Sequence, residues 1–141
     1  MAVAIAMIVF VSGVMAQDVG RKVILTPDAP KPKAIRRGQT LYLSGQIAID
    51  PATNQFLSNG SIDDQTRRVL NNLAAVLAAD GLTMDHIVST TVFLKDVNDF
   101  AKMNEVYATY FKNAPPARAT VEVARLPRDA KIEISAIAVA R

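Results

Sequence analysis

The chain has 141 residues, of which 50% are hydrophobic and 21% are charged, and its formal net charge is +3. This length and composition predict one globular domain with a real core, and they exclude a disordered chain. Cysteine is absent and histidine occurs once. Disulfides, thiolate metal sites and a cysteine nucleophile are therefore excluded, and a histidine-rich metal centre is disfavoured. The basic residues are scattered and no aromatic residues interleave them, so a nucleic-acid surface is not indicated.

The N-terminus is a separate segment. Residues 1–11 are uninterrupted apolar sequence, shorter than the roughly 20 apolar residues of a membrane-spanning helix. The run suits a signal-peptide core, with Val14 and Ala16 at the small-residue cleavage positions, but no basic residue precedes it. We predict a signal peptide over residues 1–16 and a periplasmic or secreted domain over residues 17–141, without membrane contact after cleavage. The alternatives are a missed start codon or an uncleaved apolar tail, and with them a cytoplasmic protein.

The hydrophobic pattern predicts strands and helices along the rest of the chain. The expected elements are strands at 22–26 and 40–47, a helix from 61 to about 81, a strand at 87–94, a helix at 97–111, and strands at 119–124 and 131–139. Residues 27–32 hold three prolines, so this stretch must be extended or turning.

Both helices carry a hydrophobic stripe at helical spacing. In the first, Ser61 with Asp64 resembles a capping box, and Gly81 supplies a left-handed stop. Its stripe is Val69, Leu70, Leu73, Val76 and Leu77. The stripe of the second is Phe100, Met103, Tyr107, Tyr110 and Phe111, whose aromatic residues we expect to serve packing.

The order β-β-α-β-α-β-β predicts an α+β domain with a mixed sheet and both helices on one face. The other face would carry valine, isoleucine and alanine, with no helix left to cover it. Such a face is usually buried against another copy of the chain, so we expect a homo-oligomer.

The last two strands are the most informative part of the sequence. A short turn at 126–129 joins them, and both alternate as half-buried strands do. Arg118 stands at the mouth of the first strand, and Glu133 lies between two isoleucines in the second, on the side that we assign to Thr120 and Ser135. An arginine fork binds a carboxylate in bidentate fashion, and a carboxylate among apolar neighbours can have a raised pKa and act as acid or base. The simpler alternative is a structural ion pair or two solvated charges.

The amino-acid sequence of this stretch resembles the signature of the reactive intermediate deaminase family, also called RidA or YjgF. The matching segments are Pro116-Ala117-Arg118, Val121-Glu122-Val123, Leu126-Pro127, Ile132-Glu133-Ile134, Ser44-Gly45-Gln46, the stretch at 91–96, Asp99-Phe100, Asn104 and Tyr107. They run in order from about residue 23 to the C-terminus, which is far more specific than a lone short motif.

The resemblance implies a chorismate-mutase-like fold, assembled as a homotrimer with sites between subunits. It also implies hydrolysis of reactive enamines and imines, such as 2-aminoacrylate, to a 2-keto acid and ammonia, without a metal or cofactor. The expected partner is thus a small imino acid. Arg118 would anchor its carboxylate, and Glu133 would accept the proton of water and return it to the leaving nitrogen.

Further site residues follow from the same resemblance. The backbone carbonyl of Thr120 would hold the water, at a position where the family usually has cysteine. Ser44, Gly45 and Asn104 would contact the substrate. The family usually carries a Gly-Pro-Tyr-Ser-Gln-like segment upstream, and here Lys31 falls where its tyrosine would be. The pocket is therefore expected to be more open or selective for a different side chain.

Two other functions compete with a deaminase. One is a non-catalytic module, either a small-carboxylate binder or a holdase that masks apolar surface. The other is a ribonuclease or translation inhibitor, for which the chain lacks the usual histidine or lysine acid/base pair on a basic aromatic surface. The presence of both Arg118 and Glu133 favours the deaminase, because binding alone does not need the carboxylate.

Overall fold

The computed structural model describes residues 20–26 and 33–140. The predicted signal peptide and Lys31 lie outside these residues. The strands are β1 (Arg21–Ile24), β2 (Ala34–Arg37), β3 (Thr40–Gln46), β4 (Ile87–Leu94), β5 (Ala117–Glu122) and β6 (Ile132–Val139), and the helices are α1 (Ile62–Ala78) and α2 (Phe100–Tyr110). No helix within the described ranges is long and apolar enough to cross a membrane.

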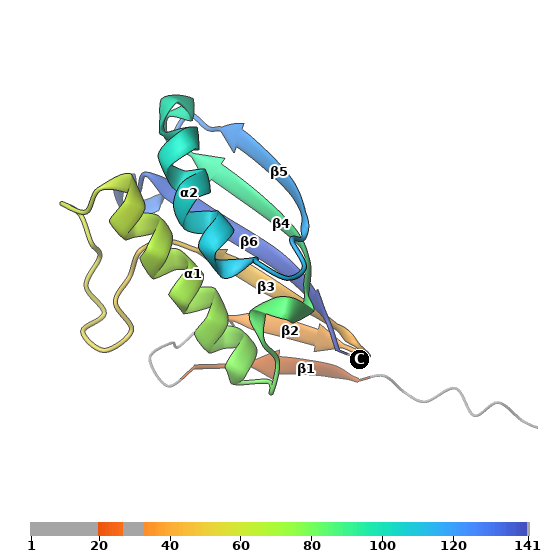
Figure 1. Cartoon of the computed structure of the whole chain (residues 1–141). Helices are drawn as coiled ribbons and strands as arrows, with labels where there is room; N and C mark the ends of the chain where they lie inside the picture. Colours follow the sequence, from red (N-terminus) through yellow and green to blue (C-terminus); the bar gives the residue numbers. More distant parts are fainter. Residues whose placement is uncertain (1–19, 27–32, 141) are drawn as a thin grey trace, which may run out of the picture.

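The strands form one six-stranded mixed sheet in the order β1-β2-β3-β6-β4-β5. All neighbours are antiparallel except β4 and β5, which are parallel. Both helices lie on the same face of the sheet (Figure 1). The predicted α+β class and the placement of the helices are confirmed.

The sequence analysis missed β2. This strand is four residues long and contains two consecutive arginines, so it shows no hydrophobic alternation. It forms because Gly38, with φ 57°, supports a tight turn that pairs Arg37 with Thr40. The true order is β-β-β-α-β-α-β-β, and the additional strand lies between β1 and β3 in the sheet.

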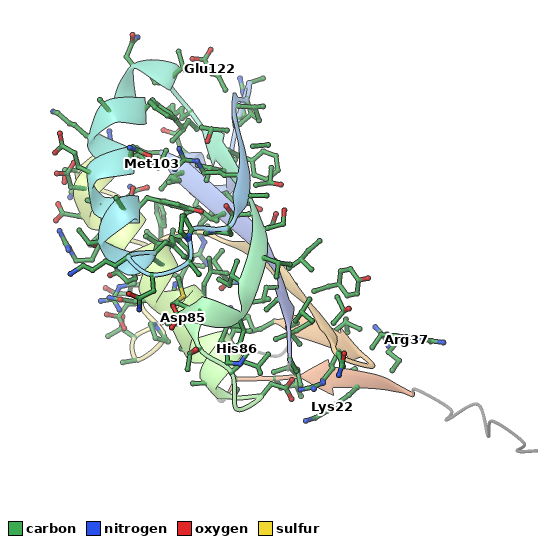
Figure 2. The ribbon with its side chains drawn as sticks, turned by 45° about the vertical axis from the view of Figure 1, so that its right-hand side comes forward. Lys22, Arg37, Asp85, His86, Met103 and Glu122 are labelled. Atoms are coloured by element: carbon green, nitrogen blue, oxygen red, sulfur yellow. The ribbon has the colours of Figure 1, made fainter. Side chains whose placement is uncertain are left out.

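The core lies between the helices and the sheet. Leu70 and Leu73 of α1 and Met103 of α2 are fully buried, as are Ile132 and Ile134 of β6. Met103 points from α2 toward the sheet (Figure 2). Each such side chain contributes about 1.5–3 kcal/mol through burial, so the buried positions hold both helices against the sheet. The stripe predicted for α1 is confirmed at every position, whereas in the second stripe Phe100 is exposed and Tyr110 is half-buried.

The ends of α1 are those that the sequence predicts. Ser61 Oγ accepts a hydrogen bond of 3.1 Å from the backbone N–H of Asp64, and the Asp64 carboxylate accepts one of 3.0 Å from the N–H of Ser61. The hydroxyl of Ser61 also donates a hydrogen bond of 2.7 Å to the Asp64 carboxylate, and this bond, with that from the Ser61 N–H, holds the pKa of Asp64 below its ordinary value. After the helix, Gly81 adopts the left-handed region with φ 73°. The capping box and the glycine stop are both confirmed.

No described helix covers the second face of the sheet, as predicted. Its large apolar side chains are exposed in the single chain by 51% at Tyr42, 48% at Val88, 44% at Val121 and 36% at Ile137. An apolar face of this kind marks an interaction surface. We call it the open face.

The last two strands are not neighbours in the sheet. A short 3-10 turn, Pro127–Asp129, leads from β5 to β6, and β4 lies between the two strands. The joining turn is confirmed, and it carries the chain past β4. β5 is thereby left at the free edge of the sheet.

Candidate active site

Arg118 lies on the edge strand β5, where it pairs with Thr90 of β4 on the helix-covered side. Its Nη1 donates a hydrogen bond of 2.8 Å to Oδ1 of Asn104 on α2. Its guanidinium carbon lies 4.6 Å from the ring centre of Tyr107 and 5.5 Å from that of Phe100. Both distances are within the range of cation–π attraction, so α2 fixes the guanidinium with two rings and one amide.

Tyr107 is itself held in place. Its hydroxyl lies 2.7 Å from Oγ1 of Thr90, and both side chains are buried. The centre of its ring is 4.5 Å from that of Phe111. Burial raises the pKa of Tyr107 above its ordinary value, although the hydrogen bond with Thr90 and the charge of Arg118 oppose this shift. Tyr107 therefore stays neutral at physiological pH and presents a fixed ring to the guanidinium.

The guanidinium of Arg118 has donors to spare. In the part of the chain that the structure describes, no acidic side chain forms an ion pair with it, and the residue is exposed. The amide nitrogen of Asn104 is a further donor beside it, because the amide oxygen is turned to Arg118. A planar group of donors next to an open edge matches the two oxygens of a carboxylate.

Thr120 brings a backbone group to the same edge. The N–H of Val123 donates to the carbonyl of Leu94 at 2.9 Å, so the odd-numbered residues of β5 turn their main-chain groups to β4. By the alternation of a parallel pair, the N–H and C=O of Thr120 point to the free edge. The hydroxyl of Thr120 is buried without a partner among the described residues. The carbonyl expected to hold water is thus on the strand of Arg118 and open to a ligand.

Glu133 lies on the other face of the sheet. Its partner on β4 is Phe93, whose neighbour Val92 is fully buried beneath the helices. Alternation therefore puts Phe93 and Glu133 on the open face. Thr120 pairs with Val92 and faces the helices. The predicted side of Glu133 is right for Ser135 and wrong for Thr120, because alternation within single strands does not show how the faces of separate strands coincide.

Gly45 makes room for the carboxylate. The pairing of β3 with β6 shifts between Leu43 and Gln46, so Ser44 and Gly45 form a bulge. A Cβ atom at Gly45 would overlap Oε1 of Glu133, so only glycine permits this close approach. Gly45 therefore lies against Glu133, and Ser44 precedes it in the same bulge.

The six predicted site residues thus form two groups. Arg118, Asn104 and Thr120 lie at the β5 edge on the helix-covered side. Ser44, Gly45 and Glu133 lie on the open face. A single chain does not bring Arg118 and Glu133 together, because the sheet separates them.

The sequence analysis assigned Phe100 and Tyr107 to packing alone and did not single out Thr90. Phe100 is 39% exposed, which is more than packing requires, and both rings contact Arg118. The spacing of Phe100, Asn104 and Tyr107 was the available signal, because positions three and four apart share one side of a helix.

The fold and the site define a class: a small α+β domain with an exposed arginine, held by two rings and one amide, at a sheet edge and a separate carboxylate on its open face. The chain belongs to the family described as Endoribonuclease L-PSP, whose sequence model matches residues 24–140. Its relatives include the YjgF gene product of E. coli and a 2-iminobutanoate/2-iminopropanoate deaminase of Mus musculus. The predicted resemblance to the RidA/YjgF family is confirmed.

Three relatives show how far the similarity extends. A RutC family protein of Pyrococcus horikoshii is 53% identical over 123 residues, covering 84% of this chain and 97% of that protein. The 2-iminobutanoate/2-iminopropanoate deaminase of Mus musculus is 43% identical over 124 residues, covering 84% of this chain and 91% of that protein. The crystal structure of the YjgF gene product of E. coli has a TM-score of 0.79 and 44% identity, covering 85% of this chain and 99% of that one.

Proposed function

We propose that this protein hydrolyses the imines and enamines of small 2-amino acids to 2-keto acids and ammonia. The observation that carries the proposal is Arg118, an exposed guanidinium held by two aromatic rings and one amide and without an acidic partner among the described residues. A guanidinium so prepared binds a carboxylate without first reorganising. The mouse relative named as an iminobutanoate deaminase supports the choice of substrate class.

The reaction needs few groups. The substrate carboxylate binds Arg118, and water held at the carbonyl of Thr120 adds to the imine carbon. Glu133 accepts a proton from the water and returns it to the nitrogen. Glu133 then transfers the hydroxyl proton of the resulting carbinolamine to the amino nitrogen, so that the C–N bond breaks, ammonia leaves, and the carbonyl of the 2-keto acid forms. An enamine enters the same route after its carbon is protonated to give the imine.

We also propose that the site forms between copies in a homotrimer. The sheet keeps Arg118 and Glu133 of one chain apart, whereas the β5 edge of one copy laid against the open face of the next would bring them together. The exposed apolar side chains of the open face, among them Tyr42 and Ile137, would be covered by the same contact. Light scattering at micromolar concentration should then report about three chains per particle.

The direct test is ammonia release while an amino-acid oxidase generates 2-imino acids in the same tube at physiological pH. We expect the protein to accelerate the loss of imine, and Arg118→Ala to reduce kcat/KM about a thousandfold, since the anchored carboxylate supplies orientation. Arg118→Lys should restore little, because it lacks the planar fork. Lys102→Gln, an equal charge change on the exposed side of α2, is the matched control. A folded wild-type protein that binds a 2-keto acid but leaves the imine untouched would instead be a carboxylate-binding module.

A further inference from the structure

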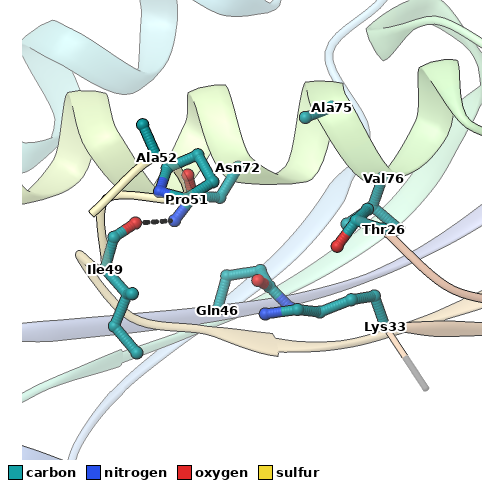
Figure 3. A pocket seen from close by; sticks show the side chains of 9 residues that line it. All are labelled: Thr26, Lys33, Gln46, Ile49, Pro51, Ala52, Asn72, Ala75 and Val76. Carbon is teal, nitrogen blue, oxygen red and sulfur yellow. Dashed lines mark hydrogen bonds between the residues drawn. The ribbon is translucent and has the colours of Figure 1, made fainter. Parts of the chain in front are cut away.

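The structure contains a cavity of about 340 Å³ away from the candidate active site. It lies between α1, the chain after β3, and the residues on either side of 27–32 (Figure 3). Of the residues matched to the family, it contains Gln46 but neither Arg118 nor Glu133. The proposed function therefore leaves this cavity without a role.

The polar groups of the cavity favour an anion. Lys33 lines it, and no acidic side chain of the described residues forms an ion pair with its ammonium group. The hydroxyl of Thr26 is buried and lacks a hydrogen-bond partner within the described part of the chain. The amide nitrogen of Asn72 is already used by the carbonyls of Ile47 and Ile49. The ammonium group of Lys33 and the hydroxyl of Thr26 would together hold a carboxylate.

The remaining walls are apolar. Ile49, Pro51 and Val76 line the cavity together with two alanines. The volume is at the lower end of the range for small-molecule sites, about 300–1,000 Å³. It suits a branched aliphatic chain of a few carbons, whose burial against these side chains adds to the affinity.

Two lining residues also hold the bulge of the candidate active site. The backbone carbonyl of Lys33 accepts a hydrogen bond of 2.9 Å from the N–H of Ser44. The side-chain amide of Gln46 donates to the carbonyls of Ser44 and Gly45, at 3.0 and 3.3 Å. Since Glu133 lies against Gly45, a molecule that moves Lys33 or Gln46 also acts on the seat of that carboxylate.

We propose that this cavity is a second small-molecule site, which takes a short aliphatic carboxylate through Lys33 and Thr26. Its occupancy reaches Gly45 and Glu133 through the hydrogen bonds of Gln46. The binding itself does not depend on the proposed deaminase activity.

The test uses NMR titration of the isotope-labelled full chain with 3-methylbutanoate. We expect saturable shifts of the Lys33, Gln46 and Val76 amide signals, accompanied by a shift at Gly45. Lys33→Gln should weaken binding at least tenfold, whereas Lys102→Gln should not. The amine 3-methylbutylamine, of equal shape and opposite charge, should not bind. Ala75→Phe places a bulky group at an exposed helix position that lines the cavity, so it should block binding without unfolding the chain.

One further variant distinguishes binding in the cavity from binding at the candidate active site. Arg118→Ala removes the carboxylate anchor of the proposed deaminase, and binding of 3-methylbutanoate to the cavity should persist in that variant. Loss of all binding in Arg118→Ala, equal affinity for the amine, or full affinity in Lys33→Gln would each overturn the second site. Shifts confined to the cavity, with Gly45 unmoved, would leave a binding site and overturn its connection to Glu133.

Discussion

The two groups of site residues differ in how complete each is within one chain. The arginine group has its support in place: Asn104 bonds the guanidinium, Tyr107 backs it, and Thr90 locks Tyr107. The glutamate group has room instead of support. Glu133 lies against Gly45, and no hydrogen bond from a described residue fixes its carboxylate.

This difference indicates distinct tasks. A group that anchors a ligand benefits from being rigid before the ligand arrives, because binding then costs little ordering. A group that moves a proton must reach both the water and the nitrogen. In the proposed mechanism, one chain therefore supplies an anchor that is rigid before the ligand arrives, whereas its acid/base should be completed by the substrate or by the neighbouring copy.

The largest expected effect comes from mixing two inactive variants. Arg118→Ala lacks the anchor, and Glu133→Gln should lose about 10²–10⁴-fold in rate, as expected for general acid/base catalysis. If each site takes Arg118 from one copy and Glu133 from the next, chains refolded together at equal amounts should regain about a quarter of wild-type activity, because half the arginine donors and half the glutamate donors are intact. The measurement is ammonia release before and after co-refolding. Mixtures no more active than their parts would assign both residues to one chain.

A smaller effect is expected from Gly45→Ala. The added methyl group overlaps the end of the Glu133 side chain, which is flexible and can turn away without disturbing the fold. We expect kcat to fall about ten- to a hundredfold, because the displaced carboxylate is no longer in reach of the proton, while KM changes little. Gly20→Ala, where nothing lies within 4 Å of the added carbon, is the matched control. Equal kinetics for both variants would remove the role of Gly45 in seating Glu133.

Local features of this chain could be predicted from the sequence, and long-range ones could not. The capping box at Ser61 and the stop at Gly81 depend only on neighbouring residues, and both are present. The side of the sheet on which Thr120 lies depends on its pairing with Val92, which no periodicity encodes.

The surroundings of Arg118 are another long-range feature that the sequence did not predict. Family resemblance identified Arg118 and Asn104, but the contact of Arg118 with Tyr107 requires α2 to lie over β5. Likewise, β2 is defined by a turn and two neighbouring strands more than by its own residues. The sequence predicted which residues belong to the candidate site, whereas their division between two faces came only from the pairing of the strands.

A tenfold effect is expected from removing the ring behind the arginine. Tyr107→Leu should raise KM about tenfold with little change in kcat, because cation–π attraction of about 1–2 kcal/mol no longer holds the guanidinium. Tyr107→Phe keeps the ring and loses only the hydrogen bond with Thr90, so its effect should be smaller. Both variants are compared in the imine assay with wild type.

A double-mutant cycle separates positioning from a general packing defect. If Tyr107 acts through Arg118, then Tyr107→Leu should not weaken the binding of a 2-keto acid any further in a chain that already carries Arg118→Ala. The cycle is read from the affinity for a 2-keto acid, which needs no turnover. If Tyr107→Leu lowered the affinity equally in wild type and in Arg118→Ala, Tyr107 would be a packing residue, as the sequence analysis first assigned it.

The smallest effect on activity, and one on stability instead, is expected at Asp80, far from both groups. Its side chain is 1% exposed and accepts hydrogen bonds of 2.7 Å from Lys22 and 2.7 Å from Arg36, which tie β1 and β2 to the end of α1. Burial alone would raise the pKa of Asp80, but these hydrogen bonds lower it below its ordinary value. Asp80→Asn should reduce the free energy of unfolding by about 2 kcal/mol at neutral pH and leave kcat/KM nearly unchanged.

The pH dependence of that loss follows from the direction of the pKa shift. A carboxyl group whose pKa is lower in the folded chain stabilises the fold above its unfolded pKa of about 4, and the contribution disappears as pH falls through the folded value. The difference in the free energy of unfolding between wild type and Asp80→Asn, measured in urea at fixed protein concentration, should therefore be largest at neutral pH and should disappear in acid. A difference that stays constant with pH would mean that asparagine disturbs packing instead of removing a charge. A large loss of activity would show that the arginine group and the glutamate group depend on the far end of the sheet. The arginine group would then be less self-contained than its contacts indicate.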